Sequence, residues 1–437
     1  MVERVSIQHI PEESRHGRPF SIFTLWLASN LTIADYALGL LLYGLPWNSI
    51  ITIVIVGNIV GSFLLGLSVA MGPKMGYPQM MISQGTFGRL GNKPFALLNW
   101  ISTVGWYTVN TILGSYSLKV LSGLTFIQAA LILSIVQAII AIYGHDIIHK
   151  FERGMAVVLG LLFVGGIIFL YPRFALMLHA YETTTHISPF TAAIVFGAIF
   201  SYIMSWSPYA SDYSRYLDKE VSIKRVILYS VAGGALASAI SEIFGTMVYI
   251  VAGNPRLNPI QAAGSLGSML ALITISAVAL GALSANVLNL YTNSLSAVTF
   301  YQKARRIQTV IIAVILGFIL AVIGGTNFET FYEDFLLTLD YWITPWLGIM
   351  IVSFYIKKLT FKDVESPTRI KATGLLAYVI GILVSLPFVN LSPYGIHFKG
   401  FIVNYLGGAD ISYFISFVSV IFFYLIMDRI SRLHPIS

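Results

Sequence analysis

Long apolar runs, separated by short polar segments, cover most of this 437-residue chain. A helix of about 20 apolar residues crosses the roughly 30 Å of hydrocarbon in a bilayer, and twelve runs are long enough to do so. The pattern therefore predicts an all-α integral membrane protein. The expected helices cover residues 20–42, 49–72, 94–118, 125–144, 154–171, 190–207, 223–252, 267–295, 307–327, 331–355, 371–389 and 410–429.

Two of these runs, the first and the sixth, are interrupted by helix-breaking residues. Pro208 removes a backbone donor and clashes with the carbonyl four residues earlier, so the sixth helix should open near Met204. In the first run Asn30 and its polar neighbours compete for backbone hydrogen bonds, which predicts unwinding between Ala28 and Thr32. A pair of broken helices at equivalent places in two halves is typical of inverted-repeat transporters with a site at the bilayer midplane.

Composition and charge fix the class and the topology. Hydrophobic residues make up 57% of the chain and charged residues 10%, which excludes an ordinary soluble domain. Cysteine is absent, so the chain has no disulfide, thiolate metal site or cysteine nucleophile. With the N-terminus inside, 22 of the 26 lysines and arginines lie on the inner side, which predicts a multi-pass plasma-membrane protein with both termini in the cytoplasm. The basic residues are spread over seven inner segments, which excludes nucleic acid, and beyond the lipid bilayer no obligatory protein partner is inferred.

The expected organisation has four parts. Residues 1–19 form a cytoplasmic N-terminal tail, and residues 20–171 form a first inverted repeat of five helices. Residues 190–355 form the second repeat, and residues 356–437 hold two peripheral helices and a C-terminal tail.

Four short motifs carry a family resemblance. They are GYPQM at 76–80, FG at 87–88, VGW at 104–106 and SPYASDYSRY at 207–216, and they resemble the nucleobase:cation symporter-1 family, with its cytosine/purine permease branch nearest. The resemblance implies a LeuT-type fold with a five-plus-five inverted repeat and broken helices 1 and 6. It also implies secondary active import of a nucleobase or related planar heterocycle, with cytosine or a purine first, by cation symport with alternating access. An allantoin-, hydantoin- or thiamine-type carrier of the same family, or an uncoupled facilitator, is the alternative.

Helix 3 carries the first expected substrate contacts. By resemblance, Trp106 is the stacking tryptophan, and Asn110 is an amide that contacts ligand in hydantoin carriers. Residues at i and i+4 also share one face of a helix, so the tryptophan ring lies beside an amide with donors and acceptors. A tryptophan that only packs in the core is the alternative.

Helix 6 should supply the opposite wall of the substrate site. The resemblance places a ligand-contacting serine at Ser205 and the usual aromatic wall at Ile203, which is a departure from the family pattern. Either Phe200 or Tyr202 then supplies the second aromatic surface, or the ligand stacks on one side only.

Helix 8 is too polar to face lipid. Asn286, Asn289 and Asn293 share one face, and Asn289 is expected to read the edge of the heterocycle. By resemblance, Ser284 contacts substrate, while Ala285 and Asn286 stand where sodium-coupled members have side-chain oxygen ligands. Ala285 offers no such oxygen, and packing of amides between helices is the alternative for this face.

No cofactor is expected beyond the coupling ion, which is sodium or a proton. Sodium would bind near Asn286, together with backbone carbonyls of Ala28 and Leu31 in the unwound part of helix 1. A proton would bind a carboxylate at membrane depth, where a structural hydrogen bond is the alternative role. The candidate carboxylates are Asp35, Glu242 and Asp340.

The inner end of helix 6 carries an expected gate. Asp212 and Arg215 stand three residues apart and should pair with each other, or with the loop between helices 2 and 3, to hold the inner end closed. A solvated ion pair is the alternative. No catalytic residues are assigned, because the eight histidines fall in loops or at helix ends and form no metal or nucleophile set. The chain is therefore expected to be a transporter and not an enzyme.

Overall fold

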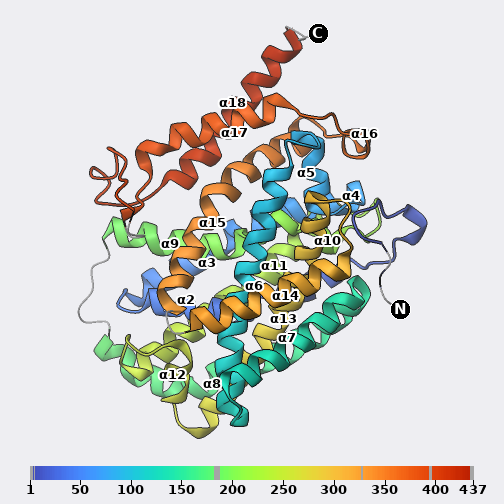
Figure 1. The fold of residues 1–437 in the computed structure, drawn as a ribbon. Helices are drawn as coiled ribbons and strands as arrows, with labels where there is room; N and C mark the ends of the chain where they lie inside the picture. The colour runs from blue at the N-terminus through green and yellow to red at the C-terminus, as the bar shows by residue number, and fades with distance from the viewer. Residues whose placement is uncertain (1–2, 4, 182–187, 326–327, 393–395, 434–437) are drawn as a thin grey trace.

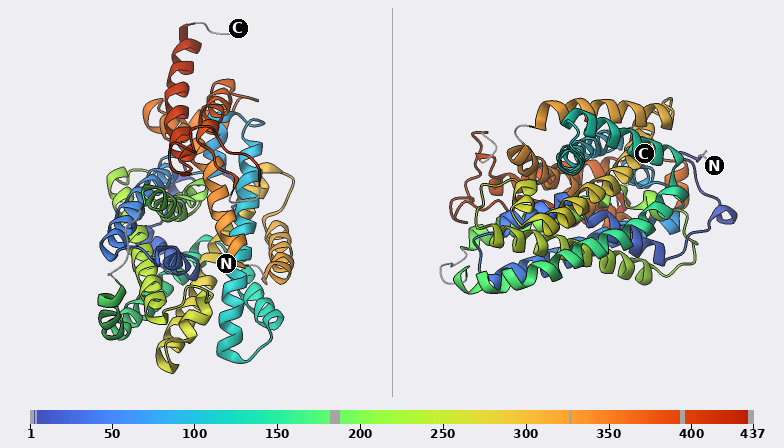
Figure 2. Two further views of the ribbon diagram at one scale, coloured as in Figure 1. Left: turned by 90° about the vertical axis from the view of Figure 1, so that its left-hand side faces the viewer. Right: turned by 90° about the horizontal axis from the view of Figure 1, so that it is seen from below.

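The computed structural model describes residues 3, 5–181, 188–325, 328–392 and 396–433. This described part is helical and contains no strand, only two isolated bridges, Gly17 to Leu217 and Asn390 to Lys399. Figures 1 and 2 show a bundle of long helices with the two C-terminal helices packed together on one side. The expectation of an all-α protein is confirmed.

The first apolar run is two helices with a sharp bend between them. α1 (Phe20–Asn30) and α2 (Ile33–Leu42) differ in direction by 59°. Thr32 has an extended backbone, and its hydroxyl accepts a hydrogen bond from the backbone N–H of Asp35, which caps α2. The chain is therefore non-helical at Leu31 and Thr32, inside the stretch where the sequence predicts unwinding.

Most residues of the connector between the second and third membrane helices are buried. The connector consists of two short helices joined at Gly76, whose φ of 67° is readily reached only by glycine. The remaining helices of the first half are α3 (Trp47–Val69), α4 (Met71–Met75), α5 (Gln79–Phe87), α6 (Lys93–Ser122), α7 (Phe126–Tyr143) and α8 (His145–Tyr181), and a 3-10 turn η1 (Glu12–Ser14) precedes α1.

Both ends of the fifth expected helix were predicted wrongly, because it was expected at 154–171 and α8 covers His145–Tyr181. α8 begins at His145 rather than at residue 154, so the charged residues Lys150 and Arg153 lie on a helix and not in a loop. The first turns of α8 are amphipathic: His145, His149 and Glu152 are buried, while the charged residues between them face outward. A search for uninterrupted apolar runs misses such a helix, because the search averages hydrophobicity over the buried and the exposed face.

The sixth apolar run stops being a regular α-helix near its C-terminal end. α9 (Pro189–Met204) ends at Met204, and after Ser205 and Trp206 the chain continues as the 3-10 turn η2 (Ser207–Tyr209) and the short α10 (Ser211–Ser214). The end of α9 falls where Pro208 predicts it. The helices that follow are α11 (Ile223–Ala252), α12 (Pro259–Gly264), α13 (Ser268–Phe300), α14 (Arg306–Gly324), α15 (Phe328–Ile351), the π-helical η4 (Val352–Ile356), α16 (Phe361–Glu365), α17 (Ala372–Ser385), the 3-10 turn η5 (Leu386–Phe388) and α18 (Ser412–Leu433).

Fewer described helices are long and apolar enough to cross a membrane than the twelve that the sequence predicts. Among the described residues, nine helices are long and apolar enough to cross a membrane, and the bent pair α1–α2 would make ten. The 30-residue α6 is about 45 Å long but more polar, and α17 with η5 is a shorter apolar helix. Twelve crossings, and the division into repeats at 20–171 and 190–355, therefore stay predictions.

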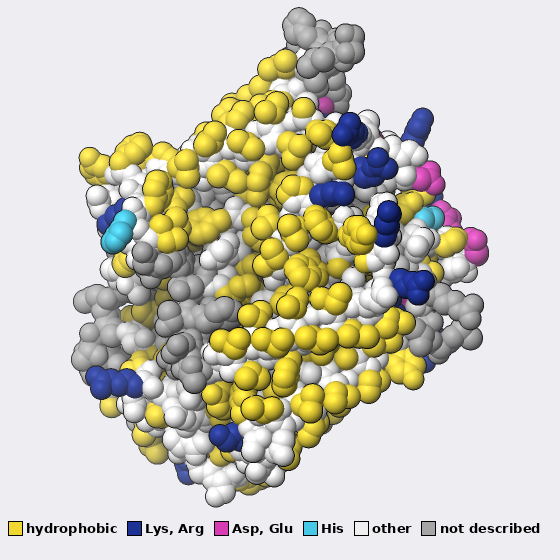
Figure 3. Space-filling model, viewed as in Figure 1, with side chains coloured by type: hydrophobic (Ala, Val, Ile, Leu, Met, Phe, Trp, Pro, Cys, Tyr) yellow, Lys and Arg dark blue, Asp and Glu magenta, His cyan; other side chains and the backbone are white. Residues whose placement is uncertain are grey.

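The outer surface fits a bilayer environment. Large apolar side chains such as Leu161 on α8 and Ile323 on α14 are each 71% exposed. Figure 3 shows hydrophobic side chains over the middle of one face, and many lysines and arginines gathered at the end where the N-terminal segment lies. This separation of apolar and basic surface supports the expected orientation of the chain.

Two glycines let α2 and α11 cross at backbone contact. A Cβ added to Gly39 would lie 2.3 Å from the backbone nitrogen of Thr246, and one added to Gly245 would lie 2.0 Å from the carbonyl oxygen of Tyr36. The neighbours are backbone atoms of packed helices, so they cannot rotate away. Any larger residue at either position must separate the two helices.

We therefore expect Gly245→Ala to lower stability by about 1–3 kcal/mol, the usual cost of overpacking a core. Thermal unfolding of the purified protein in detergent measures the change. Gly165→Ala on α8 is the matched control, because a Cβ there has no heavy atom within 4 Å. The control should be neutral or slightly stabilising, and equal melting temperatures for both variants would contradict the close crossing.

Candidate functional site

An aromatic cluster forms where α6 meets the end of α9. Trp106 on α6 is 5% exposed, and its ring lies edge-to-face with Tyr202 on α9 and Phe335 on α15, at centroid distances of 5.6 and 5.3 Å. This edge-to-face geometry is favoured between aromatic rings. Of the two aromatic residues expected opposite Trp106, the structure brings Tyr202 to it.

The other residues expected from α9 point elsewhere. Phe200 packs with Phe196, Tyr413 and Phe414 against α18. Ile203 fills the space beside Gly61 of α3 and Gly234 of α11, away from α6.

Ser205 ends α9, since its hydroxyl donates to the carbonyl of Tyr202 at 2.7 Å. The aromatic ring beside Trp106 thus comes from Tyr202, one residue before Ile203, where family register put the wall.

Phe335 was missed by the sequence analysis. Its ring lies so close to Gly105 that a Cβ there would come within 2.3 Å of it. Gly105 in the VGW motif therefore gives the ring its place beside Trp106. A glycine next to a candidate aromatic residue was the available signal, but the sequence does not identify the helix that approaches it.

The two interrupted helices are linked at this cluster. The hydroxyl groups of Tyr202 and Thr32 are 2.7 Å apart, and Thr32 also caps α2. A second aromatic contact joins the same helices, because Trp26 of α1 lies edge-to-face with Trp206 after α9, at 5.5 Å. The aromatic wall is therefore attached directly to the bend between α1 and α2.

Two expected amides carry buried oxygens that have no hydrogen-bond partner among the described residues. Asn110 donates to the carbonyl of Trp106 at 3.0 Å, and Asn289 donates to Oδ1 of Asn286 at 3.3 Å. The Oδ1 atoms of Asn110 and Asn289 accept no hydrogen bond from the described residues. Buried polar atoms normally have partners, so a ligand or water is expected at each.

Asn286 lies against α6 and α7. Its amide nitrogen is 3.0 Å from the carbonyl of Tyr107, 3.1 Å from Oγ1 of Thr111 and 3.4 Å from Oε1 of Gln137. The carbonyl of Leu31 instead abuts Gly281, since a Cβ at that glycine would be 2.6 Å from the Leu31 oxygen. The contacts of Asn286 are therefore directed away from Ala28 and Leu31, with which it was expected to bind sodium. Asn293 bonds Trp100 and Thr103 and serves as a packing amide.

Ser284 pairs with a carboxylate that the sequence analysis missed. Its hydroxyl donates to Oε2 of Glu152 on α8 at 2.5 Å, and both residues are fully buried. The other oxygen of Glu152 has no partner in the described part of the chain. Glu152 was overlooked because its segment was assigned to a loop, and the signal was the helical spacing of His145, His149 and Glu152.

Two of the expected carboxylates lie close enough to repel each other when ionised. Asp35 of α2 and Glu242 of α11 are both fully buried, and Asn58 of α3 donates to Glu242 at 2.6 Å, whereas neither carboxylate oxygen of Asp35 has a hydrogen-bond partner among the described residues. Asp340 is buried on α15, near Ser201 of α9. The structure thus brings two of the three candidates into one cluster.

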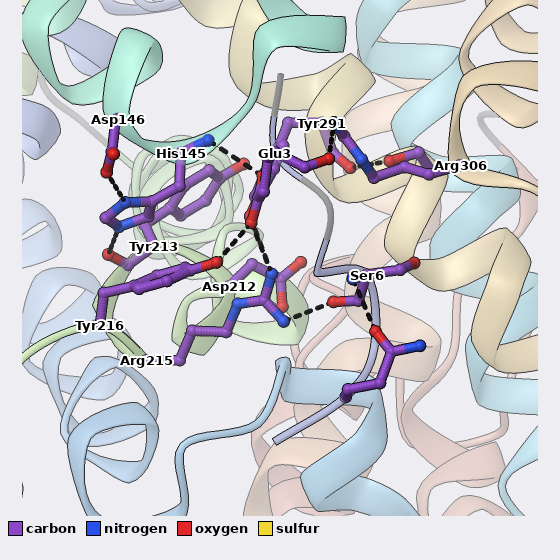
Figure 4. A network of polar contacts seen from close by, with 12 residues as sticks. Glu3, Ser6, His145, Asp146, Asp212, Tyr213, Arg215, Tyr216, Tyr291 and Arg306 are labelled. Carbon is purple, nitrogen blue, oxygen red and sulfur yellow. Dashed lines mark hydrogen bonds and ion pairs between the residues drawn. The ribbon is translucent and has the colours of Figure 1, made fainter. Parts of the chain in front are cut away.

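Asp212 and Arg215 have different partners at the inner end of the sixth run. Asp212 accepts hydrogen bonds from the backbone N–H of Gln79 and from the hydroxyl of Thr292, so it pairs with the connector loop, one of the two expected alternatives. Arg215 instead reaches Glu3 at 3.1 Å in the segment before α1 (Figure 4). A direct pair between Asp212 and Arg215 is not part of this arrangement.

Comparison with known proteins decides the family. A model of permeases for cytosine/purines, uracil, thiamine and allantoin matches residues 9–416. The chain belongs to this permease family. The expected family is confirmed, and so is the expectation of a transporter rather than an enzyme.

Curated relatives of this permease agree with the family model. A putative purine-cytosine permease, YxlA of Bacillus subtilis, is 26% identical and is matched over 99% of this chain and 97% of its own length. The purine-cytosine permease fcyB of Emericella nidulans is 24% identical over 97% of this chain and 88% of its own.

Solved structures establish the fold. Mhp1, a nucleobase-cation-symport-1 family transporter in a closed conformation with bromovinylhydantoin bound, has a TM-score of 0.81 and 16% identity, covering 100% of this chain and 97% of that one. An inward-facing form of Mhp1 has a TM-score of 0.75, with 16% identity over 100% of this chain and 96% of that one. A sodium-coupled sialic acid symporter has a TM-score of 0.68, with 14% identity over 96% and 91%. The expected LeuT-type fold of this permease is confirmed at this level.

The Glu152–Ser284 contact can be tested by stability. Ser284→Ala removes the hydrogen bond that the structure gives to a buried carboxyl group, and an unsatisfied buried acceptor costs about 1–3 kcal/mol. We expect a lower melting temperature in detergent. Ser294→Ala on the same helix is the control, because that hydroxyl bonds only the carbonyl of Tyr291 three residues back. If the Ser284→Ala variant is as stable as the control, the hydrogen bond between Ser284 and Glu152 does not contribute to stability.

Proposed function

We propose that this protein imports a neutral planar heterocycle of the nucleobase type, cytosine or a purine first, across the plasma membrane by cation symport. The observation that carries the proposal is the pair Trp106 and Tyr202, buried at the break of α9 and linked through Thr32 to the bend of α1 and α2. Both termini face the cytoplasm in this arrangement, as the distribution of lysine and arginine predicts.

The chemistry of the cluster suits such a ligand. An aromatic face stacks on a flat heterocycle whatever its ring substituents, so it supplies affinity without strict selectivity. The free Oδ1 atoms of Asn110 and Asn289 accept hydrogen bonds from ring N–H or amino groups, so they supply selectivity. Nucleobases offer both features and carry no charge to be desolvated.

The relatives support this substrate class and also supply the competitors to test. Two of them are described as purine-cytosine permeases, while the solved Mhp1 structure holds bromovinylhydantoin. A vitamin B6 transporter of Saccharomyces cerevisiae, 22% identical over 80% of this chain, is a further relative. A hydantoin-, allantoin- or thiamine-type carrier is thus the second candidate, and competition between these compounds and nucleobases for uptake distinguishes the two.

We favour a proton as the coupling ion. Two buried carboxyl groups that lie close to each other cannot both be ionised without a large electrostatic cost, so Asp35 and Glu242 together should hold a proton. Loss of that proton would place a charge on α2, three residues after Thr32 and its bond to Tyr202. Protonation is thereby linked to the substrate wall. Sodium is less well supported, because Oδ1 of Asn286, the atom that could bind sodium, already accepts a hydrogen bond from Asn289, and Ala285 has no side-chain oxygen.

Substrate affinity should depend on the ring of Trp106. Stacking is worth about 1–3 kcal/mol per base, so Trp106→Ala should weaken binding roughly tenfold or more. Trp106→Phe retains a smaller face and should lose less. Binding of radiolabelled cytosine and adenine to purified protein measures both variants, and unchanged affinity in a folded Trp106→Ala protein would exclude this residue from the site.

Proton coupling should depend on Glu242. In proteoliposomes without sodium, uptake should rise as the external pH falls, and Glu242→Gln should abolish accumulation while exchange of internal for external substrate continues. Glu220→Gln in an exposed loop is the control and should accumulate substrate normally. If a sodium gradient alone drives uptake, sodium is the coupling ion, and if neither gradient has an effect the protein is a facilitator.

A further inference from the structure

The segment before α1 is docked onto the inner end of the bundle. The carboxylate of Glu3 accepts hydrogen bonds from Nη2 of Arg215 at 3.1 Å, from the hydroxyl groups of Tyr216 and Tyr291 at 2.7 and 3.1 Å, and from the backbone N–H of His145 at 3.1 Å (Figure 4). The side chain of Arg215 is fully buried and that of Glu3 is 9% exposed. Residues of α8, α13 and the end of the broken sixth run thus surround one carboxylate.

The backbone of the same segment is held on both sides of this contact. The N–H of Glu3 donates to the carbonyl of Tyr143, the last residue of α7, and the carbonyl of Ser6 accepts from Arg215 at 2.6 Å. Farther along, Ile10 donates to the carbonyl of Gly76, and Arg15 donates to that of Pro73. The segment therefore ties together helices that lie far apart in the sequence.

The electrostatics of the contact favour an ionised Glu3. Burial alone would raise the pKa of Glu3, but the positive charge of Arg215 and the hydrogen bond from Tyr216 outweigh it, with smaller contributions from Arg306 and His145, and the pKa is lower than usual. The contact is accordingly present at neutral pH and is lost only as the pH falls through this lowered value. Arg215 would be a buried cation without a carboxylate on it if Glu3 were withdrawn, because Asp212 is engaged by Gln79 and Thr292.

The docked segment also forms one wall of a cavity at this end. The cavity has a volume of about 890 Å³, and its lining includes Glu3, Ser6 and Ile7 on one side and Tyr77, Val298 and Arg305 on the other. Opening this end of the bundle further requires that wall to move. The fold as a whole scores higher against the closed form of Mhp1 than against the inward-facing form.

We propose that Arg215, Tyr216, Tyr291 and the N–H of His145 form a carboxylate-binding pocket whose ligand is Glu3, and that the segment from Glu3 to Gly17 is an inner plug. The plug must leave the pocket before the inner end opens. The proposal goes beyond the transported substrate and holds for any cargo. It gives a role to a segment that lies outside the membrane helices, and it identifies Glu3 in that segment as the partner of Arg215.

A single introduced cysteine can test the plug, because the chain has no cysteine of its own. Val298→Cys lines the cavity, and its rate of labelling by a membrane-impermeant maleimide in inside-out vesicles reports access from the inner side. Glu3→Gln in this background should raise the rate at least threefold, since it removes the charge and leaves the shape. Glu13→Gln, an exposed carboxylate of the same segment, is the matched control and should not change the rate.

A second experiment separates release of the plug from general loosening of the fold. A chain lacking residues 1–17 should be labelled as fast as Glu3→Gln, and an added peptide of residues 1–17 should slow labelling again, whereas the same peptide with Glu3→Gln should not. Equal labelling of Glu3→Gln and Glu13→Gln, or equal protection by the two peptides, would overturn the carboxylate pocket. Labelling needs no substrate, so these outcomes are independent of the nucleobase assignment.

Discussion

A hydrogen bond between Tyr202 and Thr32 joins the two places where membrane helices are interrupted, and much of the structure depends on it. Backbone groups freed by a broken helix cannot face lipid, so each interruption must be covered by protein, water or ligand. Here the interruptions cover each other: Trp26 packs on Trp206, and Thr32 caps α2 while bonding the aromatic wall. Burial of one break therefore depends on the other.

Local chemistry explains which parts of the fold could be predicted. The break at Met204 follows from Pro208, and α11 occupies the expected residues 223–252 because its apolar run is bounded by Ser222 and by Gly253, whose φ of 64° ends the helix. α8 was placed wrongly because its first turns bury one face only, and an average over all residues hides a single buried face. Boundaries set by one residue are readable from sequence, whereas boundaries set by tertiary packing are not.

The residues of the candidate site divide in the same way, into those that the sequence can single out and those that only tertiary packing reveals. Family resemblance singled out Trp106 and Asn110 and left Tyr202 as one of two aromatic alternatives, and the structure places the rings of Trp106 and Tyr202 side by side. Phe335, Glu152 and Glu3 were not predicted, because each matters only through a contact with a distant part of the chain. Within α9 the ring that meets Trp106 lies one residue from Ile203, because only packing against α3, α11 and α18 decides which way Ile203 and Phe200 point.

Buried charge is distributed unevenly between the middle and the inner end of the protein, and this suggests a division of labour. At the inner end, Arg215 and Glu3 neutralise each other through a network of tyrosines, so neither needs a proton to remain buried. Deeper in the bundle, Asp35, Glu242 and Glu152 are carboxylates for which the described residues supply only neutral or acidic partners. A charge that has a permanent counterion can act as a latch that moves with its partner. A buried carboxyl group without one is stable only while it holds a proton or another cation, which is the property that the proposed ion coupling requires of the deeper residues.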